Sequence, residues 1–162
     1  MAHTTGSLLV RFDVSGDAVR AVCTEPNGPV WEDDCVEFFV KSPQSRYYYN
    51  FETNCIGVGL SSRRLSRDEF EHFSPEKMSA VMRRASLPKV PLDRREPCCW
   101  SVELEIPFSV LDCGDRPETL LANFYKCGNR TAVPHFLSWN PVLTPKPDFH
   151  RPEYFGKLQL EW

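Results

Sequence analysis

The sequence predicts an all-β protein, a β-sandwich of jelly-roll type with one short helix. Three observations support this fold class. Apolar and polar residues alternate in many short segments, prolines and glycines separate these segments, and only one segment has helical periodicity. The chain has 162 residues, 14 of them proline, and roughly eight or nine segments have strand character, as in two packed antiparallel sheets. We expect residues 1–162 to form a single domain that is long enough to bury a core.

Two alternating runs open the chain. Residues 8–14 and residues 18–23 flank the turn sequence Ser15-Gly16-Asp17, and this arrangement predicts a β-hairpin. Because the hairpin begins almost at residue 1, a preceding edge strand could be missing from the chain.

The most informative segment runs from a tryptophan into a strand. The apolar face of this strand is formed by Val36, Phe38 and Val40. Side chains alternate across a strand, so Glu37 is expected on the opposite face, close to Trp31 in the preceding loop. A flat indole can cover the C–H face of a pyranose, and a carboxylate can accept hydrogen bonds from two adjacent hydroxyls. The segment therefore suggests a sugar-binding site.

A second strand, residues 47–52, follows the turn at residues 42–45. If the two strands pair as a hairpin, Glu37 shares a polar face with Asn50 or Glu52. The alternative is that this polar face is merely solvated. Residues 56–60, which are rich in glycine, suggest a further short strand.

One segment has the signature of a helix. Ser74 is a good N-cap, Pro75 suits the first helical position, and the apolar residues Met78, Val81, Met82 and Ala85 follow at i, i+3, i+4 and i+7. The sequence therefore predicts a helix that continues to Ala85.

Residues 100–106 give the cleanest strand pattern, and Pro107 ends it. Glu103 and Glu105 would lie about 7 Å apart on one face of this strand, a spacing that could suit a glycosidase pair. An ordinary solvated face explains the same pattern better. Further strands are expected at residues 120–127 and 135–139 and near the carboxyl end, and Trp139 would then lie at a loop rim, as Trp31 does.

Composition excludes several classes of function. The formal net charge is −3, and the basic residues are scattered, which argues against nucleic acid as a partner. No apolar run approaches the ~20 residues that cross a bilayer, and residues 1–6 lack the features of a signal peptide. The protein is therefore expected to be cytoplasmic, or an extracytoplasmic segment of a longer secreted enzyme. Its seven cysteines are odd in number and lack CxxC spacing, so buried free thiols are expected for most of them.

Five tracts carry a resemblance to a known family. They are residues 31–40, 48–57, 122–128, 137–141 and 147–153. Together they resemble the family 9 carbohydrate-binding modules, most closely the family 9-like proteins of gut and environmental Bacteroidetes. The resemblance covers nearly the whole chain. It implies a β-sandwich without catalytic activity that binds an oligo- or polysaccharide, such as a glucan or xylan fragment, as part of a larger carbohydrate-active protein.

The resemblance also implies roles for individual residues. Two tryptophans of the family clamp a sugar, and Trp31 and Trp139 look like these two residues. Glu37 looks like the family's hydroxyl-binding acid.

Asparagines are the candidates for the rest of the polar half of the site that the resemblance implies. The family uses an arginine from the following strand, but residues 47–55 contain none, so Asn50 could occupy that neighbourhood. The family also uses an asparagine near the second tryptophan, and either Asn123 or Asn140 could supply this amide.

No cofactor is expected, with structural calcium as a minor possibility that the resemblance raises. Asp33 and Asp34 are candidate ligands, but two acids fall short of the six to eight oxygens that calcium takes.

Three other functions are open. The chain could be a haem-binding redox domain of the related cytochrome-like sandwich group, a hydrolase that uses Glu37 or Glu103 with Glu105, or a structural appendage without a ligand. The candidate haem ligands are His72, His135, His150, Met78 and Met82.

Overall fold

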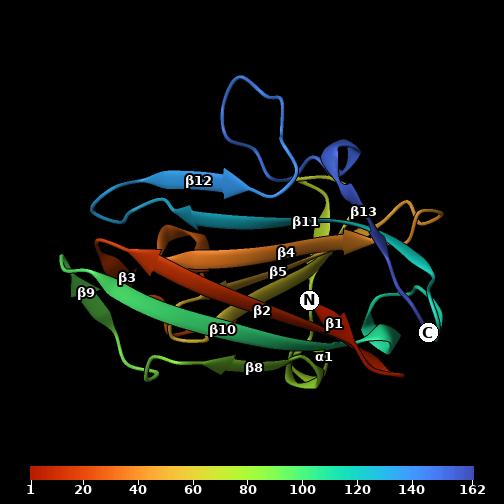
Figure 1. Cartoon of the computed structure of the whole chain (residues 1–162), viewed down its shortest axis with the longest axis horizontal. Coiled ribbons are helices and arrows are strands. Elements are labelled where there is room, and N and C mark those ends of the chain that lie inside the picture. Colours follow the sequence, from red (N-terminus) through yellow and green to blue (C-terminus); the bar gives the residue numbers. More distant parts are fainter.

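Two antiparallel sheets face each other in the computed structural model, which describes all residues 1–162 (Figure 1). The four-stranded sheet has the order β1 (Ala2–His3), β2 (Ser7–Gly16), β10 (Cys98–Pro107) and β8 (Met82–Ala85). The seven-stranded sheet has the order β12 (His135–Ser138), β11 (Thr119–Gly128), β4 (Cys35–Lys41), β5 (Tyr48–Asn54), β6 (Gly59–Arg64) and β7 (Phe70–His72), and β13 (Gly156–Gln159) also pairs with β11. A small two-stranded sheet joins β3 (Val19–Ala21) to β9 (Leu92–Arg94).

Few helical turns accompany the sheets. They are α1 (Pro75–Ala80) and the 3-10 turns η1 (Val30–Glu32), η2 (Phe108–Val110) and η3 (Pro152–Tyr154). None of them has the length and apolar composition that crossing a bilayer requires.

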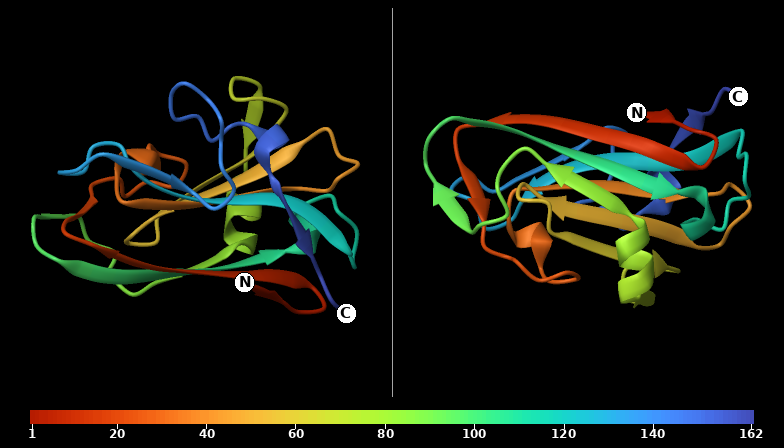
Figure 2. Two further views of the ribbon diagram at one scale, coloured as in Figure 1. Left: turned by 45° about the horizontal axis from the view of Figure 1, so that its top comes forward. Right: turned by 90° about the horizontal axis from the view of Figure 1, so that it is seen from below.

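The main core lies between the two sheets. Figure 2 (left) shows β2 and β10, in red and green, as one layer and β4 and β11, in orange and blue-green, as the other. Phe38 of β4 and Val102 of β10 are both fully buried in this core. The predicted β-sandwich with one short helix is thus confirmed.

The two strands after Trp31 do pair as the hairpin considered from the sequence. β4 and β5 are antiparallel neighbours, with Glu37 opposite Glu52 and Phe39 opposite Asn50. Directly opposed residues share a face of the sheet. Because Phe38 points into the core, Glu37 and Glu52 point together to the outer face of the seven-stranded sheet.

The predicted amino-terminal hairpin is wrong. β2 pairs with β1 and, over ten residues, with β10, while β3 pairs with β9. Alternation identifies a strand but does not name its partner, and β10 offers β2 a partner of equal length with the same alternation. The turn at Ser15-Gly16-Asp17 therefore leads the chain into another sheet.

The predicted helix is right at its start and wrong at its end. Ser74 caps α1 by accepting a hydrogen bond from the amide of Lys77, but α1 ends at Ala80, and Val81 has extended dihedral angles. Residues 82–85 form β8, where Ala85 lies opposite Val102 of β10. Pairing with the edge of the four-stranded sheet outweighs the helical spacing of the apolar residues.

Candidate functional site

A hollow of about 320 Å³ lies on the outer face of the seven-stranded sheet. Its base is formed by buried side chains from four adjacent strands: Glu37 of β4, Glu52 of β5, Arg64 of β6 and Cys127 of β11. Two acids and one arginine in a concave base can bind a polar ligand through charge-assisted hydrogen bonds.

The two acids of the base are both only 3% exposed. Burial raises the pKa of Glu37 well above its usual range, and burial raises the pKa of Glu52 to about 7 against the opposing effect of Arg64. The thiol of Cys127 donates to Glu37 Oε1 over 3.1 Å, and Asn50 Nδ2 donates to Glu52 Oε1 over 2.8 Å. Neither carboxylate forms an ion pair, so each keeps an oxygen that can accept from a ligand.

Arg64 is held in place by three contacts. Its Nε donates to Asn50 Oδ1 over 2.7 Å, its Nη1 donates to the carbonyl of Arg67 over 2.8 Å, and its Cζ lies 4.1 Å from the centre of the Phe70 ring. These contacts fix the guanidinium and leave Nη2 free to donate. Arg64 is therefore a preorganised donor at the base of the hollow.

Aromatic rings from four parts of the chain line the upper part of the hollow. They are Trp31 of η1, Phe70 of β7, Phe136 of β12 and Phe149 in the loop before η3. The first three are among the exposed large apolar side chains of the molecule. Phe149 stacks on Tyr125 of β11 with 4.1 Å between ring centres. Rings at the rim of a polar base provide flat apolar surfaces for a ligand that has both polar and apolar faces.

Backbone contacts hold Trp31 at this rim. The amide of Asn129 donates to the carbonyl of Trp31 over 3.4 Å, and the amide of Arg130 donates to the carbonyl of Glu32 over 3.0 Å. η1 is thereby tied to the turn between β11 and β12, and the indole remains 37% exposed.

Comparisons with known proteins show the family of the chain. Residues 1–160 match the model of carbohydrate-binding family 9. The chain belongs to this family. A crystal structure of a candidate carbohydrate-binding protein from Bacteroides uniformis ATCC 8492 is 38% identical and has a TM-score of 0.90, with 96% of this chain and 74% of that chain covered.

A second solved structure shares the fold. It is a family 9 module from Caldicellulosiruptor kristjanssonii in complex with glucose, with 14% identity, a TM-score of 0.54, and 97% of this chain and 72% of that chain covered. No curated protein matches the sequence.

The structure of this family 9 member brings together some of the residues that the sequence predicts for the site. Trp31 and Glu37 both line the hollow. Asn50 is fully buried beneath it and bridges Arg64 to Glu52. Asn50 thus orients two groups of the base and does not itself line the hollow.

Trp139 lies elsewhere. Its ring packs against Phe124 with 5.6 Å between centres, and a Cβ on Gly156 would come within 2.6 Å of it. Phe124 points toward the core, where it packs on Phe38. Trp139 is therefore on the other side of the seven-stranded sheet from the hollow, and the structure does not bring it to Trp31.

The two candidate amides, Asn123 and Asn140, are hydrogen-bonded to each other. Asn123 Nδ2 donates to the carbonyl of Asn140 over 2.9 Å, and the amide of Asn140 donates to Asn123 Oδ1 over 2.8 Å. Asn140 Nδ2 also donates to the carbonyl of Tyr154. Neither residue lines the hollow, and their bonds fasten the segment after β12 to β11.

Arg64 and the rings of Phe70, Phe136 and Phe149 were not found from the sequence. The arginine that the family resemblance implies was sought in β5, but Arg64 is in β6, opposite Tyr48. Continuing the strand predicted at residues 56–60 through Arg64, with its alternation, would have placed the guanidinium on the face of Glu52.

Asp33 and Asp34 do not fit a calcium site. Asp33 accepts from Arg20 Nη1, from Asn54 Nδ2 and from the amides of Val22 and Cys23, over 2.6–3.0 Å. Asp34 accepts from Lys126 Nζ over 2.8 Å and from the amide of Arg20 over 2.9 Å. Protein cations and amides already occupy these oxygens, so the two acids have a structural role between η1 and its neighbours.

The candidate haem ligands are engaged by protein groups in different places. Nδ1 of His72 lies 2.9 Å from Ser62 Oγ, and Nε2 of His135 lies 2.6 Å from Lys126 Nζ. The sulfur of Met78 lies 3.8 Å from Arg83 Nη2. Met82 is exposed on the other sheet.

His150 closes the hollow next to a second apolar cluster. Its Nδ1 lies 3.1 Å from the hydroxyl of Tyr48, and its ring centre lies 5.0 Å from that of Phe39. Burial is the first cause that lowers the pKa of His150 to about 3, and Arg64 and Arg67 add to the effect. The imidazole is therefore neutral above that pH.

This lowered pKa predicts a pH-dependent contribution to stability. The pKa of this histidine is about 3 in the folded protein and about 6.5 in the unfolded chain. Between these two pH values only the unfolded chain is protonated at His150. The free energy of unfolding therefore falls as the pH falls, by at most about 1.4 kcal/mol per pH unit. Urea unfolding at several pH values should show a shallower acid loss for His150→Gln than for the wild type. Equal slopes in the two proteins would contradict the assignment.

Proposed function

We propose that the hollow binds a glucan or xylan fragment without catalysing its cleavage. The observation that carries this proposal is the combination of two buried acids and a fixed arginine beneath a rim of aromatic rings. Membership of carbohydrate-binding family 9 supports it. So does the glucose complex of the Caldicellulosiruptor module, which has the same fold. The volume of about 320 Å³ is at the lower end of the roughly 300–1,000 Å³ range of ligand pockets and suits a short sugar segment.

Each part of the hollow has a task in this proposal. Sugar hydroxyls donate to the free oxygens of Glu37 and Glu52, and Arg64 Nη2 donates to a sugar oxygen. The indole of Trp31 covers a C–H face of the ring. This arrangement differs from the predicted clamp, because other rings at the rim, such as Phe136 and Phe149, take the place expected for Trp139.

The arrangement of acids supports binding over hydrolysis. Glycosidases place two carboxyl groups on either side of the scissile bond. Glu37 and Glu52 instead lie side by side on adjacent strands and form one surface. The other candidate pair is on the four-stranded sheet, where Glu103 accepts from Arg11 Nη1 over 2.6 Å and is partly exposed.

Isothermal titration with glucose, cello-oligosaccharides and xylo-oligosaccharides tests the proposal. We expect heat of binding with at least one series and no release of reducing sugar. Arg64→Ala should weaken binding by about tenfold or more, since a hydrogen bond to a charged group contributes about 1.5–3 kcal/mol.

Arg63→Ala is the matched control. Arg63 is the next residue of β6, but its guanidinium lies 3.6 Å from the centre of the Tyr47 ring and does not line the hollow. It should bind sugar like the wild type. The proposal fails if no sugar of either series gives heat, or if both arginine variants lose binding equally.

A further inference from the structure

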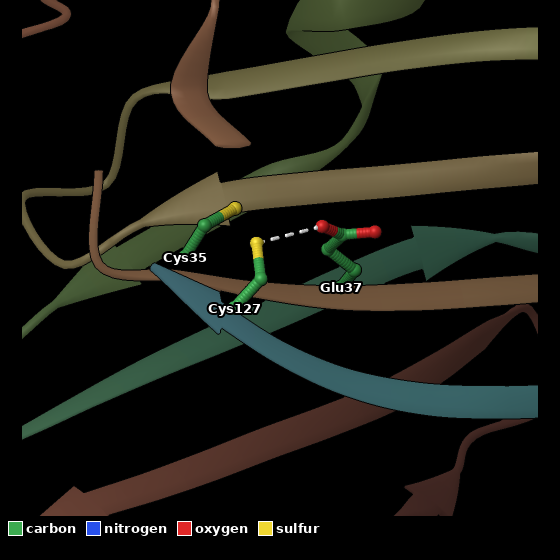
Figure 3. Close-up of side chains that lie close together, drawn as sticks. All are labelled: Cys35, Glu37 and Cys127. Atoms are coloured by element: carbon green, nitrogen blue, oxygen red, sulfur yellow. Dashed lines mark hydrogen bonds between the residues drawn. The ribbon is translucent and has the colours of Figure 1, made fainter. Parts of the chain in front are cut away.

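Two thiols and a carboxylate meet at the base of the hollow (Figure 3). Cys35 and Cys127 are directly opposed on β4 and β11, and Glu37 is two residues beyond Cys35, so all three side chains share one face of the sheet. Their ligand atoms all lie within 4.8 Å of one another, and Cys127 Sγ is 3.1 Å from Glu37 Oε1. Figure 3 shows the three side chains directed into the same space above the strands.

This donor set suits a particular class of ion. Thiolate sulfur favours soft or borderline metals, and Zn²⁺ takes thiolate sulfur at about 2.3 Å together with carboxylate oxygen at about 2.0–2.2 Å. Neighbouring ligand atoms around a tetrahedral zinc ion are thus roughly 3.5–3.8 Å apart. The ligand atoms here lie within 4.8 Å of one another, so each pair is at most about 1 Å outside this range.

The charge environment also favours a cation. Cys35, Glu37 and Cys127 are at most 3% exposed, and no lysine or arginine hydrogen-bonds to any of the three side chains. Arg64 and Lys126 affect Glu37 and Cys127 only through space, and burying groups that ionise to anions without a directly paired charge is costly. A divalent ion placed among them would supply that charge.

We propose that Cys35, Glu37 and Cys127 form a binding site for Zn²⁺ or a similar thiophilic divalent ion, with a fourth coordination position toward the hollow. Glu37 and Cys127 line the hollow, which gives the ion a path from solvent. Binding transfers the two thiol protons, and that of Glu37 where it is protonated, to solvent. The site shares Glu37 with the proposed sugar site but does not require that sugar binds.

Co²⁺ is the probe for this site, because cobalt bound tetrahedrally by thiolates absorbs visible light. Titration of the reduced, sugar-free protein should give a thiolate-to-cobalt charge-transfer band and intense d–d bands that saturate at one ion per chain and vanish when Zn²⁺ is added. Cys35→Ser and Cys127→Ser should each remove the charge-transfer intensity or weaken Co²⁺ binding by more than about tenfold.

Two further variants keep the test decisive. The Cys98→Ser, Cys99→Ser double variant removes the adjacent cysteines outside the hollow and should bind Co²⁺ like the wild type. Glu37→Gln keeps both thiols and should weaken Co²⁺ binding by more than about tenfold, which provides a result even if a buried serine prevents folding. Absence of the bands in the wild type, or bands that depend on Cys98 and Cys99, would overturn the proposal. Sugar titrations of metal-free protein report on the sugar site alone.

Discussion

Trp31→Ala should weaken sugar binding by about 30-fold or more. The indole is the largest ring at the rim of the hollow, and its backbone is held to the turn after β11, so little ordering is needed when a sugar stacks on it. Tryptophan is enriched among the residues whose truncation costs a binding surface about 2 kcal/mol or more, which corresponds to the expected loss. Titration calorimetry measures the effect, with the sugar that the wild-type protein binds most tightly.

Trp139→Ala is the control for this prediction. Trp139 is even more exposed than Trp31, at 54% against 37%, but it packs on Phe124 on the other side of the seven-stranded sheet. Its removal should leave affinity for the sugar within about twofold. If Trp139→Ala loses binding while Trp31→Ala retains it, the ligand does not bind in the hollow described above.

Local patterns in the sequence predicted one half of the candidate site. The alternation around Glu37 and the short turn after β4 are both local, and together they place Glu37 on one polar face with Asn50 or Glu52 if the strands pair, as they do. No long-range information was needed for this step. The same reasoning identified Trp31 as a rim residue.

The other half depends on the register of distant strands. Phe136 lies opposite Cys127, and both residues line the hollow. Ser138, opposite Tyr125, is on the same face of the sheet, whereas the next residue, Trp139, is on the other face. A shift of one residue reverses the face of every side chain in a strand. The sequence marks Trp139 as near a strand end but does not give this register.

Long-range pairing also explains the two errors in the fold. β2 pairs with β10, whose residues are more than 80 positions away, and β8 joins the same sheet. The spacing of apolar residues describes a segment by itself. Whether that segment forms a helix or a strand also depends on whether a neighbouring strand has a free edge with which it can pair. The end of α1 at Ala80 therefore depends on the pairing of β8 with β10 and could not be predicted from the spacing within residues 74–85.

Asp33→Ala should lower the free energy of unfolding by about 3–5 kcal/mol. The carboxylate of Asp33 is 1% exposed and accepts four hydrogen bonds, including an ion pair with Arg20 at 2.6 Å. Removing one partner of a buried ion pair leaves the other charge and two backbone amides without an acceptor, and losses of this size are typical. Urea unfolding monitored by tryptophan fluorescence provides the measurement.

Asp13→Ala serves as the comparison for this loss. Asp13 also pairs with an arginine, Arg11, at 2.8 Å, but both side chains are more than half exposed, and such solvent-screened pairs contribute little to stability. Asp33→Asn should fall between the two alanine variants, because the amide keeps an acceptor oxygen but not the charge. If the Asp33 carboxylate instead stabilised the fold by holding calcium, a chelator would destabilise the wild type as much as Asp33→Ala does. The four protein donors around Asp33 lead us to expect no effect of a chelator at this position, since the arginine already supplies the positive charge.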